Sequence, residues 1–234
     1  MRRMLRPSMR AASRWLLALG ALILTVTVAT AQDAGPPQGV RARVHLVVIG
    51  TFPREWIDPI REALERDLDV EAVIEPAALP LPDFAYYAPR RRYRAERLLE
   101  HLNRAYRDAP RSERVLGLTS RDISTTKERF HDWGILGLAD LGGRAAVVSS
   151  FRMRRRASGE RALFRMTTTA VHEVGHVLGL EHCDEPRCLM RDAEGTMDTV
   201  DAGDGALGPA CRARLEREAP RSLILTPPRS VSER

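Results

Sequence analysis

Three histidines and two glutamates are grouped in the segment HEVGHVLGLEHC, which runs from His172 to Cys183. His172 and His176 are four residues apart, so on an α-helix they lie on the same face, one turn apart. Gly179 can end such a helix in a left-handed conformation, and the resulting bend would bring His182 to the same point. Three neutral imidazoles suit a catalytic zinc whose fourth position stays open to water. The spacing therefore predicts a catalytic zinc site.

Glu173 is the residue expected to transfer protons at this site. It is rotated by about 100° from His172 on a helix, so it lies near the metal without being a required ligand. Zinc lowers the pKa of its bound water to about 7 and polarises a carbonyl group. Glu173 would take the proton of this water and pass it to a leaving amine, which is peptide-bond hydrolysis in outline. Val171, Val174 and Leu178 fall on a different face and are expected to anchor the helix in the core.

Two other interpretations of the motif stay open: an amphipathic helix with surface histidines, and a non-catalytic zinc- or peptide-binding protein. HExxH alone occurs by chance in ordinary helices, but Gly179 and His182 at fixed distances make coincidence a matter of about one in 10⁴. The presence of Glu173 favours the hydrolase, because metal binding alone does not require this residue.

The residues around the motif resemble a known family. HExxHxxGxxH is the zinc signature of the metzincin clan, and the residues that follow resemble the archaemetzincin pattern HExxHxxGxxHC-x₄-C-x-M, with Cys183, Cys188 and Met190 in the matching places. Upstream, AYYAPRRRYRAERLL is similar to the family's AYxxxRxQY stretch, although Arg92 replaces the glutamine. RVLGLTSRDI and AAVVSSFRMR also have similar counterparts, so the resemblance covers most of residues 40–214.

The resemblance implies specific roles at the site. It places the catalytic zinc on His172, His176 and His182, with Glu173 as the general base, and puts Met190 in a Met-turn that forms an apolar floor beneath the metal. Met197 is a weaker candidate for that turn. The implied fold is a metzincin-like α/β (α+β) zincin with a twisted mixed sheet, a backing helix, an active-site helix and a small irregular C-terminal subdomain. The implied activity is that of a zinc metallopeptidase, with the choice between endopeptidase and aminopeptidase left open.

The cysteines depart from the pattern that they resemble. The family continues from its methionine through about 17 residues to C-x-x-C, which supplies two of the four cysteines of a second, structural zinc. In this chain the first position of that pair is Gly208 and the second is Cys211. Cys183, Cys188 and Cys211 therefore form an incomplete set, because structural zinc sites almost always have four protein ligands.

Three outcomes are open for this set. An aspartate or a histidine could complete the site, with Asp201 and Asp204 on the nearby loop, or two cysteines could form a disulfide, or the thiols could pack as small apolar groups. We favour a weakened or absent second zinc site over the disulfide, and we expect one catalytic zinc per chain.

The remaining sequence predicts the elements that position the motif. We expect strands over residues 41–50, 69–75, 114–119 and 144–151, and helices over residues 56–68 and 93–108. The histidine helix is expected to be capped at Thr167–Thr169 and to run over residues 168–178, with a short helix beginning at Pro209. This alternation favours a layered α/β core.

The N-terminal segment, residues 1–31, has the order of a secretory signal: five arginines and no acid, an apolar run from Trp15, and Ala29-Thr30-Ala31 at the cut. We expect cleavage after Ala31 and export to the periplasm or the medium, with an uncleaved membrane anchor as the alternative. The expected domains are the signal (1–31), a linker (32–39), the catalytic domain (40–219) and a loose tail (220–234).

The basic character of the chain depends largely on that segment. The net charge is +6, with 37 basic and 31 acidic residues. Without the five arginines of the signal it falls to about +1, so a role in binding nucleic acid or an anionic membrane loses its support. We expect a monomer that acts on a peptide or protein substrate.

Overall fold

The computed structural model describes residues 39, 41–110, 112–193 and 196–219. The predicted signal, nearly all of the linker and the tail lie outside these residues, so those predictions remain untested. Among the helices of the described residues, none is both long enough and apolar enough to cross a membrane.

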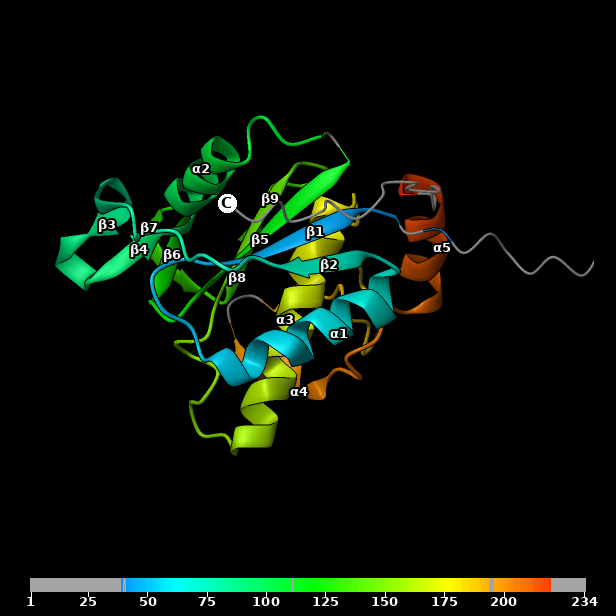
Figure 1. The fold of residues 1–234 in the computed structure, drawn as a ribbon. Helices are drawn as coiled ribbons and strands as arrows, with labels where there is room; N and C mark the ends of the chain where they lie inside the picture. The colour runs from blue at the N-terminus through cyan, green and yellow to red at the C-terminus, as the bar shows by residue number, and fades with distance from the viewer. Residues whose placement is uncertain (1–38, 40, 111, 194–195, 220–234) are drawn as a thin grey trace, which may run out of the picture. The chain divides into compact units, whose positions relative to one another are not determined.

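A five-stranded sheet forms the centre of the described structure (Figure 1). Its order is β2 (Glu71–Ile74), β1 (Arg43–Val48), β5 (Glu113–Thr119), β9 (Ala145–Ser149) and β8 (Gly137–Ala139). The first four strands are parallel, and β8 runs antiparallel to β9 at the edge. The nearly continuous burial of β5 and β9 is typical of parallel strands covered on both faces.

Helices cover both faces of this sheet. Helix α2 (Ala95–Ala105) lies on one face, whereas α1 (Ile57–Leu68) and α3 (Gly159–Val177) lie on the other (Figure 1). Successive side chains of a strand point to opposite faces, so Leu46 of β1 packs with α1 and α3 while Val47 packs with α2. This mixed arrangement confirms the layered α/β fold predicted from the alternation of helix and strand.

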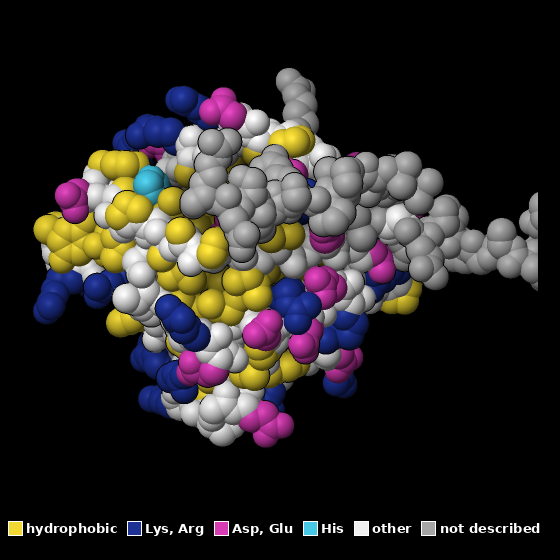
Figure 2. All heavy atoms as spheres, in the orientation of Figure 1, with side chains coloured by type: hydrophobic (Ala, Val, Ile, Leu, Met, Phe, Trp, Pro, Cys, Tyr) yellow, Lys and Arg dark blue, Asp and Glu magenta, His cyan; other side chains and the backbone are white. Residues whose placement is uncertain are grey.

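A second, four-stranded sheet was not predicted. Its order is β3 (Tyr86–Tyr87), β4 (Arg92–Arg94), β6 (Ile123–Lys127) and β7 (Phe130–Ile135). These strands are short and largely polar, so they carry little of the periodicity that marks a buried strand. Phe84, Tyr86 and Phe130 are exposed here, and Figure 2 shows hydrophobic side chains on the surface at this end, beside basic ones.

The remaining elements are short. They are the 3₁₀ helices η1 (Arg54–Trp56), η2 (Asp83–Ala85) and η3 (Ala88–Arg90), and the α-helices α4 (Met197–Ala202) and α5 (Pro209–Glu218). Helices α4 and α5 with their loops form the irregular C-terminal region, and α5 begins at a proline as predicted.

The predicted start of the histidine helix was wrong. Helix α3 begins at Gly159, and the Ser158 hydroxyl caps it by accepting a hydrogen bond from the Arg161 N–H. Ala162 and Met166 are fully buried one turn apart, so the apolar face extends well upstream of the histidines. Thr168 and Thr169, which looked like capping residues, are buried within the helix.

Candidate active site

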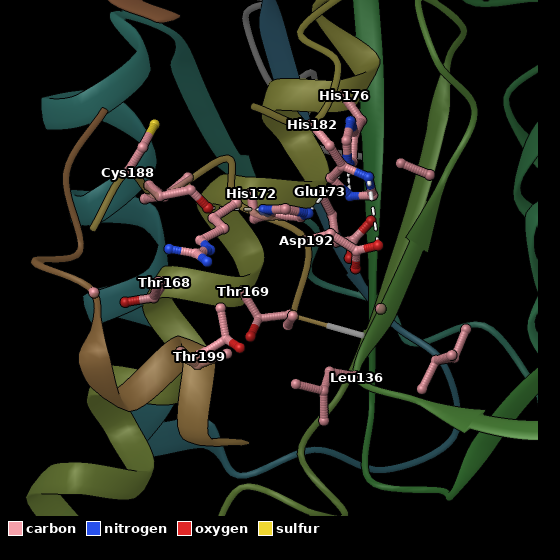
Figure 3. A pocket seen from close by; sticks show the side chains of 18 of the residues that line it. Leu136, Thr168, Thr169, His172, Glu173, His176, His182, Cys188, Asp192 and Thr199 are labelled. Atoms are coloured by element: carbon pink, nitrogen blue, oxygen red, sulfur yellow. Dashed lines mark hydrogen bonds and ion pairs between the residues drawn. The ribbon is translucent and has the colours of Figure 1, made fainter. Parts of the chain in front are cut away.

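The three histidines of the motif converge on one point. His172 and His176 project from the last turns of α3, and their Nε2 atoms lie 3.0 Å apart. Gly179 has a φ of 95°, in the left-handed region that the sequence predicts for it. The chain then turns back, and His182 places its Nε2 3.2 Å from that of His176 (Figure 3).

The other ring nitrogens fix the orientation of two of these imidazoles. His172 Nδ1 lies 2.8 Å from the Leu189 carbonyl oxygen, and His176 Nδ1 lies 2.6 Å from the Leu180 carbonyl oxygen. Because a carbonyl can only accept, each Nδ1 must donate, which leaves each Nε2 with a bare lone pair in the neutral ring. Burial, together with the neighbouring histidines, lowers the pKa of His172 to about 4 and also lowers the pKa of His176, so both rings are neutral near pH 7.

This donor set fits a zinc ion. The Nε2 lone pairs of His172 and His176 face each other at 3.0 Å, so these two rings cannot hydrogen-bond to each other, and His182 Nε2 lies 3.2 Å from that of His176. Tetrahedral zinc with bonds of 2.0–2.1 Å to imidazole separates its nitrogen ligands by about 3.3 Å, close to the spacing seen here. His172, His176 and His182 are therefore the residues that could hold the catalytic metal. His182 is the most exposed of them, and its Nδ1 lies 3.9 Å from a carboxylate oxygen of Asp192.

Glu173 lies beside this cluster and is buried. Its side chain comes so close to β8 that a Cβ on Gly137 would lie 2.5 Å from Glu173 Oε1. Burial, and secondarily the charge of Asp192, raises the pKa of Glu173 to about 8. A cation held by the histidines would oppose both effects, because it stabilises the carboxylate form.

A cavity of about 540 Å³ contains the histidines and Glu173. One wall is the segment 135–139, which includes β8, and the other comes from α3 and α4, with Thr169 and Thr199 opposite Leu136 (Figure 3). The exposed polar surface within it includes Glu181, Arg191 and Asp192. The cavity is therefore a largely apolar cleft with a few polar groups near the histidines, as is usual for a small-molecule or peptide site.

Met190 lies beneath the helix turn that carries the histidines. It is fully buried, and a Cβ on Gly175 would lie 2.8 Å from its sulfur, so the helix and the methionine are in close contact. Its carbonyl oxygen accepts a hydrogen bond of 3.1 Å from the Cys183 N–H. Met197 is half-buried at the start of α4. Met190 is thus the methionine that lies where the predicted Met-turn would be.

The three cysteines form a second cluster, with all their sulfur atoms within 4.8 Å of one another. None of them is in a disulfide. Burial raises the pKa of both the Cys183 and the Cys211 thiols. Cys188 lines the cavity too, but its sulfur lies apart from the imidazoles in Figure 3, and the histidines and cysteines form two groups that share no residue.

Neither loop aspartate that we considered for this cluster joins it. Asp201 forms two hydrogen bonds of 2.8 and 2.6 Å with the Arg165 guanidinium. Asp204 pairs with Arg187, whose Nε lies 2.9 Å away. Both carboxylates therefore already have cationic partners.

Sequence reasoning missed two acidic residues at these sites. Asp192 lines the cavity near His182 and Glu173, and its only signal in the sequence is its position two residues after Met190. Glu185 lies in the loop between Cys183 and Cys188, and the structure places its carboxylate against Gly208. No spacing in the sequence predicts that approach.

Comparisons with known proteins agree with the geometry. The family described as Peptidase family M54 matches residues 54–217. The archaemetzincin of Natronomonas pharaonis is 30% identical over 180 residues, which cover 74% of this chain and 98% of that protein.

Solved structures give the same result. The crystal structure of archaemetzincin from Methanopyrus kandleri is 29% identical, with a TM-score of 0.65, and the match covers 80% of this chain and 99% of that one. The crystal structure of archaemetzincin from Archaeoglobus fulgidus, complexed with malonate, is 28% identical, with a TM-score of 0.61. The match covers 74% of this chain and 99% of that one.

Proposed function

The chain belongs to peptidase family M54, together with the archaemetzincins, and is a zinc metallopeptidase; from this premise we propose that Glu173 is the general base of peptide-bond hydrolysis. The observation that carries the proposal is the position of the Glu173 carboxylate, which is buried in the same cavity as the three converging imidazoles. His172, His176 and His182 would hold the zinc. When bound there, zinc supplies an activated water and polarises the carbonyl group of the substrate.

The surroundings of Glu173 suit proton transfer in both directions. Burial and the nearby Asp192 raise the pKa of Glu173, whereas zinc on the histidines would lower it, so in the loaded site the carboxylate form is available to accept the proton of a water molecule. The same carboxyl group can then donate that proton to the amine that leaves. Because Gly137 has no side chain, the Glu173 side chain can lie directly against β8. This contact sets the direction in which the carboxylate points.

Strand β8 offers a surface for the substrate. It pairs only with β9 among the described residues and forms an edge of the sheet, and all three of its residues line the cavity. An extended peptide can add to such an edge through main-chain hydrogen bonds. We therefore place the substrate peptide along β8, with its scissile bond near Glu173.

The cavity also bears on the choice between aminopeptidase and endopeptidase. Glu181 and Asp192 line it in addition to Glu173. Glu181 already pairs with Arg214 at 3.0 Å, so Asp192, which lies near His182, is the carboxylate that could bind the ammonium group of a free N-terminus, as an aminopeptidase requires. Matched peptides with free and acetylated N-termini decide this, because only an aminopeptidase loses activity on acetylation.

The test of the proposal uses purified protein and a mixture of peptides, with products identified by mass spectrometry. We expect hydrolysis that a chelator abolishes and added zinc restores. Glu173→Gln should keep its zinc but lower turnover by about 10²–10⁴-fold, the usual cost of losing a general base. The matched control is Glu160→Gln, an exposed position in the first turn of the same helix. Turnover like that of the wild type in Glu173→Gln would overturn the assignment.

A further inference from the structure

Glu185 occupies the space that a side chain at position 208 would fill. A Cβ built on Gly208 would lie 2.3 Å from Glu185 Oε2 and 2.5 Å from its Cδ. Heavy atoms do not approach so closely, so the carboxylate group and a side chain at residue 208 are mutually exclusive in this arrangement. Position 208 is the one at which the resembled pattern has its missing cysteine.

The Glu185 carboxylate is incompletely satisfied where it lies. Its Oε2 is buried and has no hydrogen-bond partner among the described residues. A buried carboxylate oxygen without a partner is costly, and such groups are normally paired with a cation or bound to a metal. Asp201 and Asp204 differ in this respect, because each is already paired with an arginine.

Backbone N–H groups surround the cysteine sulfurs. The N–H groups of Met190 and Gly208 lie 3.4 and 3.3 Å from Cys188 Sγ, and the Glu185 N–H donates to the sulfur of Cys183. Such donors hold the sulfurs in place and stabilise the thiolate form that a metal requires. Three sulfurs within 4.8 Å of one another provide three corners of a tetrahedral site, and zinc accepts a carboxylate oxygen as the fourth ligand.

From these contacts we infer that Glu185 replaces the missing cysteine and completes a second zinc site with Cys183, Cys188 and Cys211. The Glu185 carboxylate lies against Gly208, outside the group formed by the three sulfurs within 4.8 Å, so this coordination requires its flexible side chain to rotate toward them. The site is closed, with four protein ligands and no open position, and its role is to hold the loop 183–188 against α5. It is independent of the proposed role of Glu173, because no hydrolysis takes place there.

The test counts metal on the full chain, with zinc or cobalt alone as the probe. Cobalt held by thiolates gives charge-transfer absorption that a three-histidine site lacks, so this absorption reports on the cysteine site only. We expect about two zinc ions per wild-type chain and a cobalt–thiolate absorption. Glu185→Gln should lower the affinity of the second site more than about tenfold, so that mild chelation leaves about one zinc and exposes the thiols to titration. The matched control is Asp184→Asn, an exposed carboxylate of the same loop, which should retain both ions.

A second variant keeps the test decisive if Glu185→Gln destabilises the loop. Glu185→Ala combined with Gly208→Cys removes the overlapping carboxylate and restores a fourth sulfur. This double variant should regain the second zinc and the cobalt absorption, while Glu185→Ala alone should not. One zinc per wild-type chain with freely reactive thiols would overturn the inference. Two zinc ions in Glu185→Gln, with the chelator resistance of the wild type, would overturn it as well.

Discussion

Gly137 of β8 touches the carboxylate of Glu173 so closely that no larger residue fits at that position without moving it. A Cβ on Gly137 would lie 2.5–2.7 Å from three atoms of the Glu173 side chain. The edge strand therefore does more than line the cleft: it determines where the carboxylate lies relative to the histidines.

Gly137→Ala should consequently impair hydrolysis while leaving the metal in place. The added methyl group meets the Glu173 side chain, including its Cγ, rather than the backbone, so the buried side chain must shift. A displacement of about 1 Å at a catalytic group can cost about 10²-fold in turnover. Turnover and zinc content, measured on the same sample, check this expectation. Gly159→Ala is the control, because a Cβ there meets open space; equal turnover in the two variants would contradict the expectation.

His182→Ala should weaken the binding of the catalytic zinc itself. His182 is the proposed third ligand, carried by the loop after Gly179, and its side chain is about half exposed. Losing a partner that merely orients a metal ligand costs about 10- to 100-fold in affinity, so losing a ligand should cost at least that much. Zinc affinity can be measured by competition with a chelator. His131→Ala, an exposed histidine on β7, is the control. Unchanged zinc affinity in His182→Ala would show that the third ligand is another residue.

Asp201→Asn should destabilise the protein in a pH-dependent way. Arg165 is buried, and its hydrogen bonds to Asp201 hold the pKa of that carboxyl below its usual range. Replacing the carboxylate by an amide removes a charge-assisted hydrogen bond, which contributes about 1–3 kcal/mol. Because the folded-state pKa is lowered, this stability is fully present above the unfolded pKa of about 3.9 and is lost as the pH falls through the folded value.

Urea unfolding of wild type and variant at several pH values measures this difference. The gap in the free energy of unfolding should be constant above about pH 5 and should shrink below about pH 4. Asp198→Asn, exposed on the same helix, should show a much smaller gap. A gap for Asp201→Asn that does not change with pH would mean that the pair with Arg165 is not its source.

The protein should be exported, with cleavage after Ala31. The arginine-rich start, the apolar run and the small residues before the cut carry this proposal. N-terminal sequencing of the protein isolated from its native cells should show a chain that begins at Gln32. Recovery of intact Met1 in a membrane fraction would instead support an uncleaved anchor.

The strands and helices that the sequence predicts correctly are those with a strong pattern of apolar residues, either a continuous run or a helical spacing. β1, β5 and β9 are buried on both faces and read as apolar runs, and α1 and α2 show apolar residues at helical spacing. The small sheet was missed because its strands alternate weakly and depend on partners distant in the chain: β4, for example, pairs with β6. Pairing of that kind is a tertiary property that local patterns do not record.

The residues of the two candidate metal sites also divide into those that local sequence patterns predict and those that they do not. The convergence of His172, His176 and His182 could be predicted because it follows from helix geometry and one glycine turn. The approach of Glu185 to Gly208 could not, because it depends on how α5 packs against the loop that follows the histidine helix. A different tertiary contact, between α4 and α3, places Asp201 against Arg165, which removes it from the set of possible metal ligands.

The loop that follows α3 belongs to both clusters at once. His182 is bonded to Cys183, and Leu189, whose carbonyl oxygen holds His172, is bonded to Cys188 and Met190. Ordering this loop reduces conformational entropy, and that cost is incurred only once. Whichever cluster is fixed first therefore lowers the cost for the other, so metal binding at the two should show positive cooperativity.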